Sequence, residues 1–136
     1  MGPLSKIRVL LADDYRPLLE SVLGLLEPGF EIVGEAQNGQ ALVEAALQLK
    51  PDVIVTDISM PILNGIEAAK RLREAGSTSK IVFLTVLSDP DFIRTCLATG
   101  AVGYVVKGRL ASDLEPAIQE AVAGRIFISP ALESEG

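Results

Sequence analysis

The stretch Asp52-Val53-Ile54-Val55-Thr56-Asp57-Ile58-Ser59-Met60-Pro61 sets the architecture of this chain. Residues 53–56 are apolar or β-branched, which predicts a strand buried on both faces at the centre of a parallel sheet. Pro61 prevents the strand from continuing, because proline lacks a backbone N–H and restricts the residue before it. Asn64-Gly65 then supplies the turn and cap that begin a helix. We therefore expect Asp57 at the carboxyl end of a central strand, where open α/β sheets place their functional sites.

Composition narrows the class of protein. The 136 residues suffice for one domain with a single substantial core. Hydrophobic residues make up 49% of the chain and charged residues 22%, with a net charge of −6, which excludes a disordered chain and argues against a nucleic-acid-binding surface. No apolar run reaches the roughly 20 residues of a membrane span, and no signal peptide opens the chain. We expect a soluble, cytoplasmic protein that does not contact membranes.

The chain has no histidine and a single cysteine, Cys96. One cysteine permits no internal disulfide, which suits a reducing compartment. The absence of histidine removes the commonest general base, the commonest metal ligand and any ordinary serine–histidine triad. Carboxylate oxygens are therefore the main candidates for metal ligands.

Strand-like and helix-like segments alternate along the chain. Short connections between such units force right-handed crossovers and a parallel sheet covered on both faces. We predict a five-stranded, doubly wound α/β fold with the flavodoxin-like strand order 2-1-3-4-5 and helices on both faces. Residues 1–5 are expected to be a leader or an expression remnant, residues 6–124 the domain, and residues 125–136 the start of a linker. The expected strands are 7–12, 30–33, 53–57, 81–85 and 103–106, and the expected helices are 17–27, 39–50, 65–74, 89–99 and 112–123.

Five polar residues fall at the expected strand ends, which share one edge of a parallel sheet. Each has an ordinary explanation alone, as a turn residue, a helix cap, a β-branched strand residue or a solvated lysine. These separate roles do not readily explain why all five residues lie at the same edge of the sheet. Carboxylates close together repel one another unless a cation is bound between them. A set of oxygen ligands without histidine favours Mg²⁺. A lysine and a hydroxyl beside such a site suit the binding of a phosphoryl group. These residues are Asp13, Asp14, Asp57, Thr85 and Lys107.

Four motifs together resemble the response regulator receiver domain of two-component signalling, over roughly residues 7–124. Segments 9–14, 100–104 and 124–130 resemble the subfamily whose output is a C-terminal helix-turn-helix DNA-binding domain. By this resemblance, DNA contact would belong to that output domain, which this chain does not contain, and residues 125–136 would lead to it. The motifs are Leu11-Ala12-Asp13-Asp14, the run from Asp57 to Gly65, Thr85, and Gly103-Tyr104-Val105-Val106-Lys107.

The resemblance implies a role for each acid. Asp57 resembles the acceptor that takes a phosphoryl group from the phosphohistidine of a sensor histidine kinase. Asp14, Asp57 and the backbone carbonyl of Ser59 resemble the ligands of Mg²⁺, with Asp13 acting through water. Such a domain assists its own phosphorylation and dephosphorylation, and it is not an enzyme acting on other substrates.

The resemblance also implies a switch. Lys107 would pair with the phosphoryl oxygens, and the Thr85 hydroxyl would be drawn toward them. Tyr104 would then turn into the space that Thr85 vacates. Phosphorylation adds charge and acceptor oxygens at one point, which biases an element with two packings. The altered surface would mediate dimerisation or release the output domain, and so control transcription.

Some positions depart from the usual receiver pattern. Gly108 stands where many receivers have proline, so the last loop is expected to be looser or differently placed. Val86 is larger than the usual residue after the threonine and could crowd the phosphoryl site. Ser59 and Leu87 occupy positions that tune phosphate lifetime, and Tyr15 lines the rim where many of this subfamily have histidine.

Three alternatives stay open. A phosphorylation-independent interaction module is favoured by Val86 and Gly108. An aspartyl-phosphate hydrolase also uses a strand-end Asp nucleophile, but it usually needs a second acid at the position of Ser59. A flavin-binding flavodoxin-like protein is disfavoured, because Asp13-Asp14 would repel a phosphate after the first strand.

Overall fold

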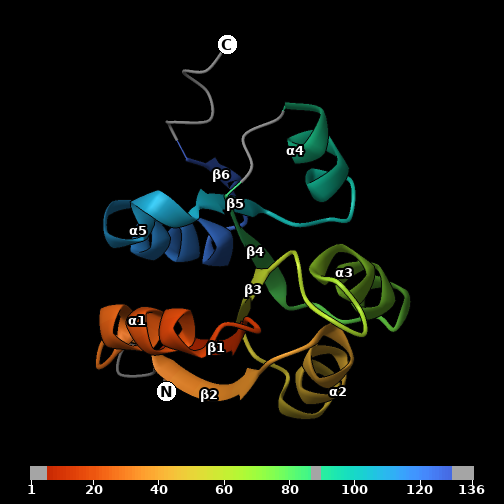
Figure 1. Ribbon diagram of the computed structural model, residues 1–136, viewed down its shortest axis with the longest axis horizontal. Helices are drawn as coiled ribbons and strands as arrows, with labels where there is room; N and C mark the ends of the chain where they lie inside the picture. Colours follow the sequence, from red (N-terminus) through yellow and green to blue (C-terminus); the bar gives the residue numbers. More distant parts are fainter. Residues whose placement is uncertain (1–5, 87–89, 130–136) are drawn as a thin grey trace.

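The computed structural model describes residues 6–86 and 90–129, which form one sheet between two layers of helices (Figure 1). The prediction that Asp89 caps a helix, and the position of Leu87, fall outside these residues. The strands are β1 (Arg8–Ala12), β2 (Glu31–Ala36), β3 (Val53–Asp57), β4 (Lys80–Thr85), β5 (Gly103–Val106) and β6 (Phe127–Ile128). The helices are α1 (Arg16–Leu26), α2 (Gly39–Leu49), α3 (Gly65–Glu74), α4 (Pro90–Leu97), the short 3₁₀ helix η2 (Lys107–Arg109) and α5 (Leu110–Val122).

All neighbouring strands in the sheet are parallel, in the order β2-β1-β3-β4-β5-β6. The predicted order 2-1-3-4-5 is confirmed, but the prediction of five strands is corrected to six. The additional strand, β6, pairs Phe127 with Gly103 and Ile128 with Tyr104. A strand of two residues is too short to show the alternation by which strands are recognised in a sequence.

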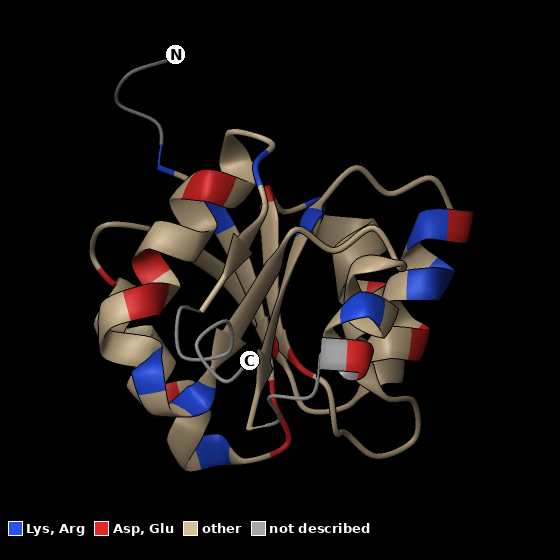
Figure 2. Ribbon diagram, turned by 90° about the horizontal axis from the view of Figure 1, so that it is seen from above, with Lys and Arg blue, Asp and Glu red and all other residues tan. Residues whose placement is uncertain are grey.

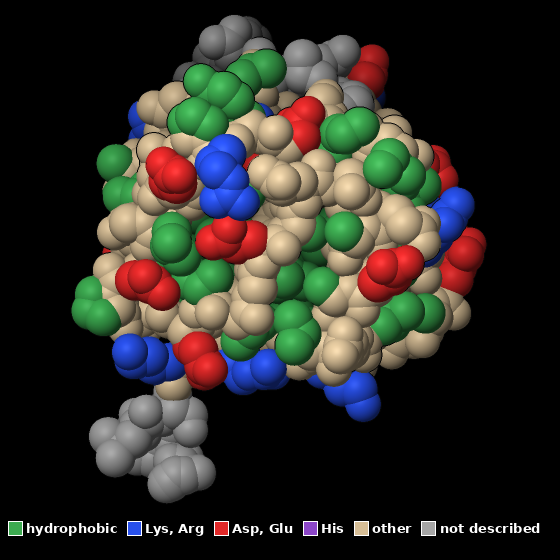
Figure 3. Space-filling view, turned by 60° about the horizontal axis from the view of Figure 1, so that its bottom comes forward, with side chains coloured by type: hydrophobic (Ala, Val, Ile, Leu, Met, Phe, Trp, Pro, Cys, Tyr) green, Lys and Arg blue, Asp and Glu red, His purple; other side chains and the backbone are tan. Residues whose placement is uncertain are grey.

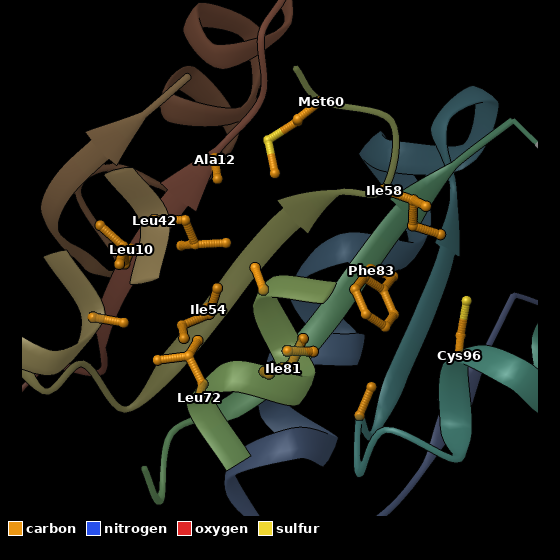
Figure 4. Packing of buried hydrophobic residues seen from close by; sticks show 14 of the residues in the cluster. Leu10, Ala12, Leu42, Ile54, Ile58, Met60, Leu72, Ile81, Phe83 and Cys96 are labelled. Carbon is orange, nitrogen blue, oxygen red and sulfur yellow. The ribbon is translucent and has the colours of Figure 1, made fainter. Parts of the chain in front are cut away.

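Alternating side chains along each strand build two separate cores. On β1, Val9 and Leu11 face α1 and α5, whereas Leu10 and Ala12 face the layer of α2, α3 and α4. This follows from the two-residue period of a strand, which sends successive side chains to opposite faces. Figure 4 shows the second core, in which labelled side chains from β1, α2, β3, α3, β4 and α4 share one space. The central strand β3 is buried along its whole length, as predicted.

Local signals explain where the helices begin. The side-chain oxygen of Asn38 accepts a hydrogen bond from the Ala41 N–H, and that of Asn64 accepts one from the Glu67 N–H, both at 2.8 Å. These caps occupy two of the N–H groups that a first helical turn leaves unpaired. Helix α5 begins at Leu110, two residues before the predicted start, because η2 leads directly into it.

Surface charge is mixed on the side of the molecule that carries the edge strand β2. Figure 3 shows hydrophobic side chains scattered among acidic and basic ones there, without one extended field of either sign. No helix within residues 6–86 and 90–129 is both long and apolar enough to cross a membrane.

Candidate functional site

Three carboxylates meet at the carboxyl edge of the sheet, where Figure 2 shows acidic residues between the two helical layers. Asp13, Asp14 and Asp57 each offer an oxygen, and these oxygens all lie within 4.8 Å of one another. Strands β1 and β3 are adjacent and parallel with Ala12 opposite Thr56, so the residues that follow, Asp13 and Asp57, meet at the same level. Asp13 and Asp57 are buried and Asp14 is exposed.

Lys107 supplies the opposing charge. It directly follows β5, and its Nζ lies 3.1 Å from Asp57 Oδ1 and 3.3 Å from Asp13 Oδ2. The lysine side chain is only 23% exposed and both carboxylates are less so, which limits the screening of these ion pairs by water. The structure therefore brings together four residues that the sequence analysis placed at this edge.

The environment of Asp57 disfavours its negative charge. Burial and the nearby Asp13 carboxylate raise the pKa of Asp57 above its ordinary value. Lys107 and the Ile58 N–H, which donates to Asp57 Oδ1 at 2.8 Å, offset this only in part. A further cation at this point would stabilise the ionised carboxylate.

Asp13 has one satisfied oxygen and one that lacks a hydrogen bond. Its Oδ1 accepts from the Tyr15 N–H at 2.8 Å, whereas the buried Oδ2 has no hydrogen-bond partner despite the nearby Lys107 ammonium. Buried polar atoms are normally satisfied, so this oxygen points to a missing partner. Three carboxylates, with no histidine or cysteine grouped with them among the described residues, fit the hard, oxygen-seeking Mg²⁺ ion.

Two of the predicted contacts to the metal ion do not involve a direct side-chain ligand. Ser59 is exposed and follows Asp57 by two residues, on the connection between β3 and α3, and its backbone carbonyl as a ligand stays a prediction. The water-mediated role of Asp13 also stays a prediction. Its burial, with one oxygen already held by Tyr15, distinguishes it from the exposed Asp14.

Thr85 and Tyr104 lie on the same face of the sheet. Phe83 pairs with Tyr104, and Thr85 pairs with Val106, so the two predicted switch residues are diagonal neighbours on adjacent strands. Both are buried, and the Tyr104 side chain is fully enclosed in the core beneath α3 and α4. The two residues therefore lie near each other on one face of the sheet, and a switch that couples them stays a prediction.

Three exposed apolar side chains surround this edge. Tyr15, Ile62 and Val86 follow β1, β3 and β4, and they are 64%, 78% and 76% exposed. Val86 thus points largely to solvent at the end of β4. The sequence analysis did not identify Ile62, which adopts a φ of 69°, a left-handed conformation that is unusual for a β-branched residue.

The loop after β5 contains the short 3₁₀ helix η2, and the expectation that Gly108 makes this loop looser or differently placed stays a prediction. Gly108 lies within η2, and Arg109 Nε donates to the Asp113 carboxylate at 2.8 Å. Asp113 is buried and also accepts from Ser129, which is itself buried beyond α5. The sequence analysis missed both residues, because their polar side chains resemble those of a helix surface and a linker.

This fold, with its acids and lysine at the carboxyl edge, agrees with the receiver motifs noted in the sequence. The chain belongs to the response regulator receiver domain family, whose model matches residues 9–119.

Particular relatives share the similarity over nearly the whole chain. The chain is 38% identical over 126 residues to the nitrate/nitrite response regulator protein NarL of Escherichia coli (strain K12), covering 91% of this chain and 58% of that protein. It is 37% identical over 128 residues to the uncharacterized transcriptional regulatory protein YvfU of Bacillus subtilis (strain 168), covering 93% of this chain and 64% of that protein. The chain thus spans less than two thirds of each regulator.

Solved structures give the same result. A two-component response regulator of the LuxR family from Aurantimonas sp. SI85-9A1 has a TM-score of 0.90 and 31% identity, with 96% of this chain and 95% of that chain covered. The isolated receiver domain of RcsB from Salmonella enterica serovar Typhimurium, solved with the phosphomimetic BeF₃⁻, has a TM-score of 0.86 and 26% identity, with 96% and 98% covered.

Proposed function

We propose that this domain is a phosphorylation-activated switch in which Asp57 accepts a phosphoryl group from a sensor histidine kinase in the presence of Mg²⁺. The observation that carries the proposal is the position of Asp57. It is buried at the end of the central strand, beside Asp13 and Asp14, with the Lys107 ammonium 3.1 Å from its carboxylate. This arrangement suits phosphoryl transfer, which depends on positioning and on stabilisation of negative charge.

The chemistry at Asp57 is a displacement at phosphorus. A carboxylate oxygen of Asp57 forms the new P–O bond while the P–N bond of the phosphohistidine breaks, and the departing histidine nitrogen keeps the electron pair. Asp14, Asp57 and the Ser59 carbonyl would hold the Mg²⁺ ion, and Asp13 would contact it through water. The bound ion would neutralise charge on the phosphoryl oxygens. Lys107 and the Ile58 N–H orient the Asp57 carboxylate by their contacts with Oδ1.

Transfer changes the charge at one point of a crowded site. A phosphoryl group brings the local charge to about −1.5 to −2 and adds acceptor oxygens. Lys107 then pairs with these oxygens and Thr85 donates its hydroxyl to them, which biases the packing of Tyr104 beneath α4. The shared face and diagonal register of Thr85 and Tyr104 support this route.

The partners follow from the same site. The exposed apolar side chains of Tyr15, Ile62 and Val86, which follow β1, β3 and β4, are available to contact a protein that carries the phosphohistidine. In a longer regulator, the altered surface of α4, β5 and α5 would support dimerisation and the control of transcription by a DNA-binding output domain. Similarity to the transcriptional regulatory protein YvfU and to the response regulator NarL supports this role, which would be carried out in the cytoplasm.

The test is to map the modified residue. Incubation with acetyl phosphate and Mg²⁺, followed by peptide mass spectrometry, should show one added phosphoryl group on Asp57, and chelation of the cation should prevent it. Asp57→Asn should abolish the modification. Asp52→Asn, at the opposite end of β3, is the matched control and should leave it unchanged.

Three outcomes would contradict this proposal. Phosphorylation at another residue with Asp57 unmodified would remove Asp57 from its role. An unmodified Asp57 in a chain that still binds its partner would favour the phosphorylation-independent interaction module. Release of phosphate from small phosphate esters with turnover would instead indicate an aspartyl-phosphate hydrolase, although the exposed Ser59 offers no general acid.

A further inference from the structure

A second buried polar cluster lies behind Lys107, outside the group of three acids. Its members are Asp113 in the first turn of α5 and Ser129, which follows β6; Asp113 is 4% exposed and Ser129 is fully buried. Ser129 Oγ donates a hydrogen bond to Asp113 Oδ2 at 2.8 Å, although the two residues are 16 positions apart. Figure 1 shows β6 beside β5 and next to α5, which places the tail of the domain against the strand that leads to Lys107.

This cluster holds both ends of the turn that carries Lys107. On one side, the Val106 N–H donates to Ser129 Oγ at 3.0 Å. On the other side, Arg109 Nε donates to Asp113 Oδ2 at 2.8 Å. Lys107 lies between Val106 and Arg109, so Asp113 anchors one end directly and the other through Ser129.

The tail is also fixed to β5 itself. The Ser129 N–H donates to the backbone oxygen of Tyr104 at 2.9 Å, in line with the pairing of Ile128 with Tyr104. Ser129 therefore spans β5 between Tyr104 and Val106. A change in the position of β5 at either residue acts on Ser129 directly.

Gly108 contributes no side-chain packing to the turn. A Cβ at this position would have no heavy atom within 4 Å. Glycine also gives the backbone more freedom than any other residue. The position of the Lys107 ammonium thus depends on the anchors at either end of the turn.

We propose that Asp113 and Ser129 are positioning residues for Lys107, and that through them the seating of residues 125–129 is coupled to the occupancy of the phosphoryl site. The proposal rests on the proposed function of Asp57 and Lys107. The hydrogen bonds of Ser129 and Asp113 hold the turn so that Lys107 faces the phosphoryl site, and a seated tail therefore favours occupancy of that site. Coupling between two sites is reciprocal, so occupancy favours the seated tail by the same factor, and loss of the tail anchor weakens binding at the phosphoryl site.

The ordinary explanation is that Asp113 only stabilises the start of α5, where acids are favourable. Ser112 separates these two explanations. Its hydroxyl contacts Asp113 at 2.9 Å and the Arg109 backbone oxygen at 3.3 Å, both at the start of α5, and it makes no described hydrogen bond to β5 or to residues 125–129. The charge on Asp113 is well supported: burial raises its pKa, but hydrogen bonds from Arg109, Ser129 and Ser112 outweigh this and leave the pKa below its ordinary value.

The experiment compares Ser129→Ala with the matched control Ser112→Ala in the whole chain. Two titrations are measured by NMR, one with Mg²⁺ alone and one with beryllofluoride, a phosphoryl mimic, at saturating Mg²⁺. In Ser129→Ala the dissociation constant for beryllofluoride should rise about tenfold, since Lys107 contacts the mimic, whereas that for Mg²⁺ alone should change less than twofold. Both constants should stay within twofold of wild type in Ser112→Ala.

Equal weakening of Mg²⁺ and beryllofluoride binding in Ser129→Ala would show a merely structural role and overturn the proposal. Equal changes of the beryllofluoride dissociation constant in Ser129→Ala and Ser112→Ala would also overturn the proposal. Should Ser129→Ala not fold, wild-type protein supplies the test: beryllofluoride should change hydrogen exchange of the Val106 and Ser129 amides at least threefold, and unchanged exchange would overturn the coupling.

Failure of the proposed function has a different signature. If wild-type protein binds no beryllofluoride at Asp57, that function is wrong. The positioning of Lys107 is then tested without ligand, by the amide signals of Lys107 and Gly108. These should move in Ser129→Ala, and changes confined to residues 125–129 would overturn the positioning role.

Discussion

At the scale of single residues, the site combines burial with unbalanced charge. Asp13 and Asp57 are held in the protein interior, Lys107 is the one cation that pairs with them among the residues that the structure describes, and one oxygen of Asp13 lacks a hydrogen bond. Such an arrangement lowers the stability of the free domain and raises its affinity for a cation, because the uncompensated charge is relieved on binding.

The first prediction concerns the charge on Asp57. Because its pKa is raised in the folded state, the folded protein binds the proton more tightly than the unfolded chain does. Ionisation of Asp57 therefore costs stability as the pH rises through the folded-state pKa. Asp57→Asn removes this cost, so the variant should be more stable than wild type at pH 7, and the gain should shrink toward pH 4.

Urea denaturation at both pH values, without divalent cations, measures the effect. Asp52→Asn serves as the control and should show no gain that is specific to pH 7. An Asp57→Asn variant no more stable than wild type at pH 7 would contradict the assignment of the raised pKa.

The second prediction concerns Lys107. Lys107→Ala should fold and still be phosphorylated, but phosphorylation should no longer alter the surroundings of Tyr104. The lysine contact with the phosphoryl oxygens exists only in the phosphorylated state, where a charge-assisted hydrogen bond contributes about 1.5–3 kcal/mol. Amide chemical shifts of the variant, with phosphorylation verified by mass spectrometry, measure the response.

Lys70→Ala is a suitable control, since Lys70 is an exposed lysine of α3 that pairs only with Glu67 among the ion pairs described. It should respond like wild type. A full response at Tyr104 in Lys107→Ala would remove the lysine from the switch.

At the scale of elements, the start of α3 is what holds the end of β3 in place. The Gly65 N–H donates to the Ile58 backbone oxygen at 2.7 Å, and a Cβ at Gly65 would lie 2.3 Å from the Asp57 backbone oxygen. No side chain fits in that space without displacing Asp57. The helix that follows the central strand thus fixes the backbone of Asp57.

The third prediction follows from this close approach. Gly65→Ala should lower the free energy of unfolding by about 1–3 kcal/mol and slow the phosphorylation of Asp57, because the added methyl group pushes on its backbone. Gly24→Ala is the matched control: Gly24 lies inside α1 with open space around its Cα, so alanine should stabilise by about 0.5–1 kcal/mol. Urea unfolding and the rate of acetyl phosphate transfer measure both variants. A neutral Gly65→Ala would show that α3 shifts freely from β3.

Helix α4 is the element best placed to move. It spans eight residues, and its side chains described as buried in the core are Ile93 and Cys96. The fourth prediction is that beryllofluoride with Mg²⁺ perturbs amide signals of residues 86–108 more than those of residues 17–50, since few packing contacts oppose a shift of α4. Changes confined to the neighbours of Asp57 would mean that the domain binds the mimic without switching.

Cys96 offers an independent readout of this helix. It is fully buried, and burial raises the pKa of its thiol to about 11. At pH 7 roughly one thiol in 10⁴ is then ionised, so a thiol reagent should label the free domain slowly. Faster labelling on addition of beryllofluoride and Mg²⁺ would report movement of α4.

At the scale of the whole molecule, the doubly wound topology gathers the site from distant parts of the sequence. Strands β1, β3, β4 and β5 are neighbours in the sheet, and each delivers its last residues to the same edge. The two helical layers protect the sheet, which leaves this edge as the place where acids and lysine meet solvent. Binding at the edge therefore acts on the whole cooperative fold.

The fifth prediction is a stability linkage. If Mg²⁺ binds the folded domain alone, it should add about 2.7 kcal/mol to the free energy of unfolding at a concentration 100 times its dissociation constant. Asp14→Ala loses a carboxylate ligand and should lose most of this gain at the same concentration. Calcium-free urea titrations with and without Mg²⁺ provide the measurement, and an equal gain in Asp14→Ala would exclude it as a ligand.

The sequence alone determined the alternation of elements, the strand order and the residues at the strand ends. Each rests on a local signal: a buried apolar run, a cap such as Asn64, or a strand-breaking residue such as Pro61. Because parallel strands share one edge, these signals also predicted that Asp13, Asp57 and Lys107 would meet.

Only the tertiary structure decided the sixth strand, the exposed Ile62 at the rim and the cluster of Asp113 and Ser129. Strand β6 has two residues and so has no periodicity to recognise. Asp113 and Ser129 are polar residues of ordinary surface type, and their burial depends on a partner 16 positions away. Contacts between distant residues are set by the packing of the whole fold, and a single sequence carries no local pattern that records them.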